Sequence, residues 1–197
     1  MSRAVNDDAL DVLFRKARTF RKWRTEPVTK QMLMAIYDVL RWGPTTNNTG
    51  PVRVVFVVSP QAKERLKPHL NKGNVEQTML APATAIIAYD LAFFEMMGKL
   101  SPNPDARESW SKKGEAEVFE AAMRNSSLQG AYFIVAARAL GLDCGPMSGF
   151  DNEGVDKEFF AGTKIKSNFL CNIGYGDETG MKARAGRLDF DEACRIL

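Results

Sequence analysis

The sequence predicts an α+β fold, and three observations support this class. Residues 52–58 and 84–89 are short apolar runs typical of buried strands, whereas residues 115–140 carry the longest helical pattern. Several helices separate the strands without a regular strand-helix-strand repeat, which argues against a doubly wound sheet. The chain has 197 residues, 45% of them hydrophobic, and no composition shift marks a boundary. We therefore expect one domain over residues 1–197 with a single core.

The N-terminal part of the chain predicts two helices. Residues 8–23 carry apolar side chains at the helical spacing i, i+3, i+4 and i+7, namely Leu10, Leu13, Phe14 and Ala17. A second helix is predicted over 30–41, with Thr29 as its N-cap and Gly43-Pro44 as its stop.

The middle of the chain alternates strands and helices. The strand over 52–58 is followed by Ser59-Pro60, which predicts an N-cap and a helix with proline in its first position. A short helix over 74–80 precedes the strand over 84–89. Residues 90–113 then lose any regular pattern while keeping large aromatic residues, so we predict a mobile cover with aromatic anchors.

The C-terminal part begins with the predicted core helix over 115–140, which Gly141 should end. We predict a loop over 144–150, a short helix opened by Asp151 and a strand over 169–173. The remaining residues form a tail.

Composition limits the classes of function. A net charge of +3, spread over residues of both signs, argues against a nucleic-acid partner, although residues 15–24 are locally basic. The three cysteines make no metal spacing with the only histidine, His69, so neither a metal site nor a disulfide framework is predicted. No signal peptide or membrane-length apolar run is present, and we expect a soluble, cytoplasmic protein.

Residues 44–51, Pro-Thr-Thr-Asn-Asn-Thr-Gly-Pro, are the most informative stretch. Three threonines and two asparagines between a helix stop and a buried strand exceed what a turn needs, so we interpret the stretch as a ligand-lining loop. The chain has no dinucleotide or P-loop motif, and His69 lies at a predicted helix end where it is expected to be a surface residue. Because hydrolysis lacks a general base, redox chemistry on a bound cofactor is favoured.

Residues 44–51, together with residues 17–23, resemble motifs of the flavin-dependent nitroreductase family. The resemblance implies a mostly antiparallel or mixed sheet surrounded by helices, with FMN as cofactor. It implies that Arg18, Thr19 and Arg21 bind the ribityl phosphate, and that Thr46 and Asn48 line the ring.

Further matching blocks follow in family order. Asn74 and Gln77 fall where the family has an asparagine and a basic residue, so the neutral Gln77 departs from the pattern. Ser148 and Gly149 match the loop whose backbone approaches flavin N5, and a glycine there allows close approach to a flat ring. Near the C-terminus, Lys182 and Arg184 match the last basic pair of the family, which closes on the phosphate.

A closer resemblance is to the malonic semialdehyde reductases of bacterial uracil degradation. It is carried by Trp42-Gly43-Pro44-Thr45, Arg124-Asn125-Ser126-Ser127, Lys166-Ser167-Asn168 and residues 145–151. The subfamily usually has a His-Asn-Gly run where this chain has Phe20-Arg21-Lys22, which puts cofactor affinity in question more than reaction type. The resemblance implies ping-pong hydride transfer from NADH or NADPH through flavin N5, reducing malonic semialdehyde to 3-hydroxypropionate.

The family resemblance also implies a homodimer with both flavins at the interface and the C-terminal segment exchanged. Residues 181–197 carry apolar side chains suited to such packing. For the substrate carboxylate we favour Arg107 or Arg124 as partner. Two alternatives stay open: a broad nitroreductase or quinone reductase of the same fold, and a flavin- or nucleic-acid-binding module without turnover.

Overall fold

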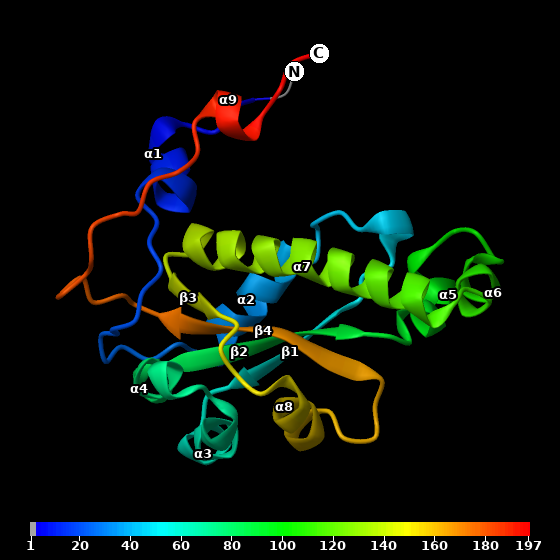
Figure 1. Ribbon diagram of the computed structural model, residues 1–197, viewed down its shortest axis with the longest axis horizontal. Helices are drawn as coiled ribbons and strands as arrows, with labels where there is room; N and C mark the ends of the chain where they lie inside the picture. The colour runs from blue at the N-terminus through cyan, green and yellow to red at the C-terminus, as the bar shows by residue number, and fades with distance from the viewer. Residues whose placement is uncertain (1–2) are drawn as a thin grey trace.

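A four-stranded antiparallel sheet lies at the centre of the computed structural model, which describes residues 3–197 (Figure 1). Its strands lie in the order β1-β2-β4-β3, with bounds β1 Val52–Val57, β2 Ala83–Asp90, β3 Asp143–Met147 and β4 Ile165–Gly174. Every neighbouring pair is antiparallel, so the sheet confirms the α+β class.

Helices cover both faces of this sheet. The bounds are α1 Asp7–Leu10, α2 Lys30–Leu40, α3 Pro60–Leu66, α4 Lys72–Leu80, α5 Met97–Leu100, α6 Ala106–Ser111, α7 Glu115–Ala139, α8 Asn152–Phe159 and α9 Phe190–Ala193. Shorter helical turns are η1 Asp11–Arg15, η2 Thr46–Asn48, η3 Lys67–His69 and η4 Phe93–Met96. Helices α2 and α7 pack on one face, and α3, α4 and α8 on the other (Figure 1).

The alternation of side chains along β2 feeds the two cores. Ile87 packs with Leu40 of α2 and Phe133 of α7, whereas its neighbour Ile86 packs with Leu66 of α3 on the opposite face. All five of these side chains are fully buried. Because successive strand residues face opposite sides, a strand buried on both faces reads as a continuous apolar run.

The predicted helix starts at Thr29 and Ser59 are confirmed. The Thr29 hydroxyl accepts a hydrogen bond from the Met32 N–H at 3.3 Å, and the Ser59 hydroxyl accepts one from the Ala62 N–H at 3.1 Å. Each satisfies a donor that the first helical turn leaves without a partner.

The predicted helix over residues 8–23 is wrong beyond Arg15. The following segment is extended, and its backbone pairs with strand ends: the Phe20 N–H donates to the Cys144 carbonyl at 3.0 Å, and the Arg24 N–H to the Tyr175 carbonyl at 2.8 Å. The same pairing involves β3, which occupies part of the predicted loop. Strand β4 also begins at Ile165, ahead of the predicted start at residue 169.

Helix α7 is the predicted long helix, but three of its large apolar side chains face outward. Phe119, Leu128 and Tyr132 are 47%, 47% and 44% exposed. Its buried face carries many small and polar residues, and a methyl group added at Gly130 would meet the Phe169 ring at 2.6 Å. The close approach of α7 to the sheet therefore requires small residues inside and leaves an apolar stripe outside.

The predicted cover over 90–113 folds into η4, α5 and α6. Phe93, Met97 and Trp110 are buried, and the rings of Phe93 and Trp110 meet edge to face with centroids 5.1 Å apart. The aromatic anchors are confirmed, while the mobility of this segment stays a prediction.

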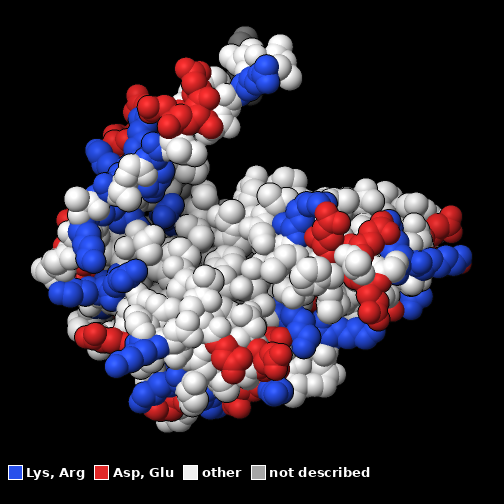
Figure 2. Space-filling model, viewed as in Figure 1, with Lys and Arg blue, Asp and Glu red and all other residues white. Residues whose placement is uncertain are grey.

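The two ends of the described chain form an arm that projects from the body of the molecule (Figure 1). Figure 2 shows a largely uncharged hollow between this arm and α7. Within the arm, Leu188 and Ile196 are 69% and 85% exposed. No helix within residues 3–197 is long and apolar enough to cross a membrane.

Candidate functional site

A cavity of 710 Å³ lies between residues 17–22 and the start of the tail, and we call it the basic cavity. Asp177 is the one acidic residue among its lining residues. Seven lining residues are cationic: Arg18, Arg21, Lys22, Arg138, Lys182, Arg184 and Arg187. Lysines and arginines gather on this side of the molecule in Figure 2. Such a concentration of like charge favours an anionic ligand.

Two reciprocal hydrogen bonds close this cavity on one side. The Arg18 guanidinium donates to the Lys182 carbonyl at 2.6 Å, and the Arg184 guanidinium donates to the Ala17 carbonyl at 2.7 Å. Thr19 also lines the cavity. The structure thus brings together on one cavity the five residues predicted for a phosphate: Arg18, Thr19, Arg21, Lys182 and Arg184.

Asp177 stays charged at the edge of this cavity. The backbone N–H of Thr179 donates to its carboxylate, as does the Thr179 hydroxyl, both at 2.8 Å. These hydrogen bonds hold the pKa of Asp177 below its ordinary value. One negative charge therefore offsets part of the positive field.

A second cavity of 390 Å³ adjoins the first and shares Arg21, Lys22 and Asp177 with it. Gln77 lines this second cavity. Its side-chain amide donates to the Asn74 Oδ1 at 2.5 Å, and the Asn74 amide donates to the Gly149 carbonyl at 2.8 Å. Gln77 therefore lines the cavity next to the basic cavity, and hydrogen bonds connect it to Asn74 and Gly149. Asn74, Ser148 and Gly149 line neither of the two cavities.

Gly149 lies in a tight turn that has no room for a side chain. A methyl group added there would lie 2.6 Å from the Asn74 Nδ2. The Gly149 carbonyl accepts two hydrogen bonds, from the Asn74 amide and from the Asn71 N–H at 3.1 Å. Within residues 3–197 the Gly149 N–H has no acceptor. The absence of a side chain at Gly149 therefore lets the Asn74 amide approach the backbone closely, and the turn leaves one N–H donor free.

The polar loop of residues 44–51 is fixed by side chains outside it. The Thr46 N–H donates to the Oδ1 of Asn125, which is 1% exposed, at 2.8 Å. The Asn48 amide donates to the Leu100 carbonyl at 2.8 Å. Asn47 and Asn48 both have positive φ, 49° and 56°, a conformation that asparagine tolerates better than most residues. Together these contacts join the loop to α7 and to the cover segment.

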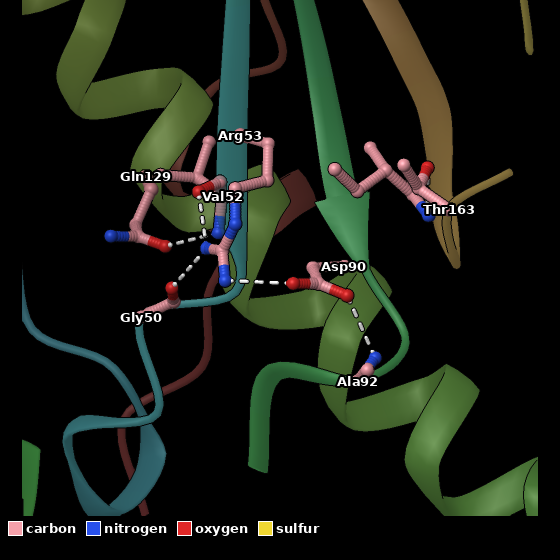
Figure 3. A network of polar contacts seen from close by, with 8 residues as sticks. Gly50, Val52, Arg53, Asp90, Ala92, Gln129 and Thr163 are labelled. Carbon is pink, nitrogen blue, oxygen red and sulfur yellow. Dashed lines mark hydrogen bonds and ion pairs between the residues drawn. The ribbon is translucent and has the colours of Figure 1, made fainter. Parts of the chain in front are cut away.

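An arginine-carboxylate pair fixes the end of this loop (Figure 3). The Arg53 guanidinium donates to the Gly50 carbonyl at 3.1 Å and to the Asp90 carboxylate at 2.8 Å. Asp90 in turn accepts from the Ala92 N–H at 2.8 Å, at the start of the cover. Sequence reasoning missed this pair, because opposite charges near the ends of two strands meet only in one register of those strands.

Thr46 and Asn48 lie far from the basic cavity of the same chain. Thr46 contacts α7 at Asn125, whereas Arg138 of the same helix lines the basic cavity. The two α7 positions are 13 residues apart (138 − 125). At 1.5 Å per residue this corresponds to about 20 Å. The structure thus divides the predicted site residues into two groups.

The two arginines predicted for the substrate carboxylate are exposed and paired. Arg107 forms an ion pair with Glu95 at 2.7 Å, and Arg124 pairs with Glu120 one turn away. Neither lines the basic cavity, its neighbour or the 390 Å³ cavity between Asn48 and the cover.

Within residues 3–197, no group of three or more histidine, cysteine or carboxylate side chains could hold a metal ion. His69 ends the η3 turn, where it is partly buried and its ring approaches Gly154.

Comparison with known proteins identifies the relatives of this chain. The model of the Nitroreductase family matches residues 14–175. A Stenotrophomonas maltophilia K279a protein, named "Putative NADH dehydrogenase/NAD(P)H nitroreductase", is 55% identical over 196 residues and covers 100% of both chains. The chain belongs to the nitroreductase family. A Burkholderia lata protein of the same name is 54% identical over 192 residues, 98% of each chain.

Solved structures agree on the fold. A Bacillus subtilis protein, "putative nitroreductase ydfN", has a TM-score of 0.86 at 20% identity, over 98% of this chain and 100% of that one. An Exiguobacterium sibiricum "putative nitroreductase in complex with FMN" has a TM-score of 0.86 at 16% identity, over 100% of both chains. The predicted nitroreductase-like fold is therefore confirmed.

Proposed function

We propose that this nitroreductase is an FMN-dependent NAD(P)H oxidoreductase. The observation that carries the proposal is the basic cavity, which adjoins a second cavity lined by Gln77, whose side chain is joined through Asn74 to the turn with the free N–H of Gly149. A phosphate needs cations and hydroxyl donors, which Arg18, Arg184 and Thr19 supply. A flavin ring needs a backbone donor at its reactive edge, and the free N–H of Gly149 offers one. The names of the two relatives above support NAD(P)H as reductant.

The residues of the chain bind and orient, whereas the redox chemistry belongs to the cofactor. The chemistry supplied by bound FMN is hydride transfer from NAD(P)H to an acceptor. Arg18, Arg21 and Arg184 would hold its phosphate in the basic cavity. Ser148 and Gly149 would present backbone to the reactive edge of the ring, at a position fixed by Asn71 and Asn74.

The acceptor we propose is malonic semialdehyde, reduced to 3-hydroxypropionate. Support comes from the subfamily motifs, two of which meet in space: the Asn168 amide donates to the hydroxyls of Ser126 and Ser127, both at 3.0 Å. The same geometry would serve a nitro compound or quinone. Comparison of kcat/KM for malonic semialdehyde and for a simple quinone decides between the two functions, since the reductant and cofactor are shared.

The functional unit we propose is a homodimer with an exchanged tail. The apolar stripe on α7 and the apolar residues of the arm are exposed in one chain, as a second copy would require. The separation of about 20 Å between Thr46 and the basic cavity also supports a site shared by two chains. In that arrangement, Thr46 and Asn48 of one chain line the flavin held by the other.

The proposal is tested on the purified protein. We expect a yellow protein with one FMN per subunit, identified by chromatography of the pigment released on denaturation. Oxidation of NAD(P)H by this protein excludes a binding module without turnover. Release of FAD, or no flavin after incubation with FMN, would contradict the proposal.

A further inference from the structure

We propose that Gln77 is a positioning residue that acts through Asn74 to orient the peptide of Gly149. The inference rests on the proposed function, because the backbone that it orients carries the N–H proposed to face the flavin. It assigns to Gln77 a role other than direct contact with the phosphate.

The hydrogen bonds from Gln77 to Gly149 have a defined polarity. Gln77 donates through Nε2 to the Asn74 Oδ1, and Asn74 donates through Nδ2 to the Gly149 carbonyl. An asparagine side chain has one donating end and one accepting end. Since Gln77 engages the accepting end, the donating end of Asn74 is directed to Gly149. A reversed Asn74 would place two carbonyl oxygens against each other.

Gln77 is itself held by the core. Its backbone carbonyl accepts from the Trp23 indole at 3.1 Å and from the Asn172 amide at 3.2 Å. Asn172 is fully buried on β4, and its Oδ1 accepts from the Thr84 hydroxyl of β2 at 2.7 Å. Gln77 is only 8% exposed. Its backbone is therefore fixed to the sheet, while its side chain donates to Asn74.

The result is a fixed pair of peptide planes at Gly149. The Gly149 carbonyl has two donors, from Asn74 and Asn71. The Phe150 N–H lies in the same plane and donates to the Ser148 carbonyl at 3.1 Å, which links this plane to that of the Gly149 N–H. The Gly149 N–H itself is left without an acceptor in residues 3–197. Loss of the Gln77 donor would free Asn74 to rotate and would remove one of the two hydrogen bonds that hold the carbonyl. The direction of the Gly149 N–H would then be less well defined.

The variant Gln77→Glu tests the polarity directly. A carboxylate cannot donate to the Asn74 Oδ1, whereas a protonated carboxyl can. In the flavin-free protein we expect the NMR signals of the Gly149 amide and carbonyl to be displaced at pH 8. They should return toward the wild-type position as the carboxyl is protonated at lower pH. Gln77→Leu should be displaced at every pH.

The matched control is Gln61→Glu, the same chemical change at an exposed position of α3. It should leave the Gly149 signals at their wild-type positions throughout the titration. Wild-type Gly149 signals in both Gln77 variants would overturn the inference. This result does not depend on flavin, so it is distinguishable from failure of the proposed function, which would be shown by wild-type protein that binds no FMN.

A second measurement uses the FMN-loaded protein. Loss of one hydrogen bond from the positioning contacts should slow flavin reduction by NAD(P)H about 3- to 10-fold in Gln77→Glu at pH 8. The rate of flavin reduction in Gln77→Glu should approach the rate in Gln61→Glu as the pH falls. The rate in Gln77→Leu should show no such recovery. A slow rate in Gln77→Glu that is independent of pH would indicate general disruption and would contradict the positioning role.

Discussion

Removal of one cation from the basic cavity tests the proposed phosphate site most directly. In Arg184→Ala, the lost contact is a charge-assisted hydrogen bond to the phosphate. Such a bond contributes about 1.5–3 kcal/mol, or about 10- to 150-fold in affinity. Arg184 is exposed, and six other cations line the same cavity. Solvent screening and the remaining charges place the expected loss near the lower limit, about 10- to 30-fold.

Fluorescence titration of the flavin-free protein with FMN measures this loss. The difference between wild type and Arg184→Ala should narrow at high salt, because an exposed charge contact is screened. Arg184→Lys should lie between them, since lysine keeps the charge without the planar guanidinium that also binds the Ala17 carbonyl. The control is Lys157→Ala, an exposed cation of α8 outside the cavity. Equal FMN affinity in the Arg184 and Lys157 variants would refute the assignment.

Three further perturbations have defined outcomes. A chain ending before Arg187 should lose dimerisation and flavin together in analytical ultracentrifugation, and a flavin-loaded dimer of that chain would refute the exchanged tail. Burial lowers the pKa of the Lys63 ammonium to about 8 from 10.5, so between these values the unfolded chain binds more protons and stability should rise with pH. The free energy of unfolding in urea, measured at pH 7.5 and 10, should show this rise in wild type and not in Lys63→Met. An equal change with pH in both proteins would contradict the assignment to Lys63. Of Arg107→Ala and Arg124→Ala, at least one should raise KM for malonic semialdehyde without changing KM for a quinone, and if neither does, both arginines are surface charges.

The sequence predicted the elements whose signals are local. The residues of β2 are buried on both faces and formed a continuous apolar run, and the caps at Thr29 and Ser59 bind within their own first turns. The helix stop before the loop over 44–51 and the strand after it were also predicted, whereas the role of this loop in lining a ligand stays a prediction. Each of these signals lies within a few residues of the structure that it specifies.

Features set by distant contacts were not predicted. Residues 17–23 have helical spacing, but backbone pairing with Cys144 and Tyr175 makes the segment extended. The length of α7 predicted a core helix but not which face would be buried. Contact with the sheet selects small residues such as Gly130 and leaves Phe119 and Leu128 about half exposed. The pairing of Arg53 with Asp90 depends on the register of β1 and β2, which neither strand reveals alone.

The position of Thr46 about 20 Å along α7 from the basic cavity has a genetic consequence. If each flavin site takes its loop from one chain and its cations from the other, a substitution in the loop and a substitution among the cations of one chain affect different sites of the dimer. A chain damaged at Thr46 and a chain damaged at Arg184 would each form inactive dimers. Coexpressed in equal amounts, they would form mixed dimers in which one site is intact and the other carries both defects. With random pairing half the dimers are mixed, so about a quarter of all sites would recover activity.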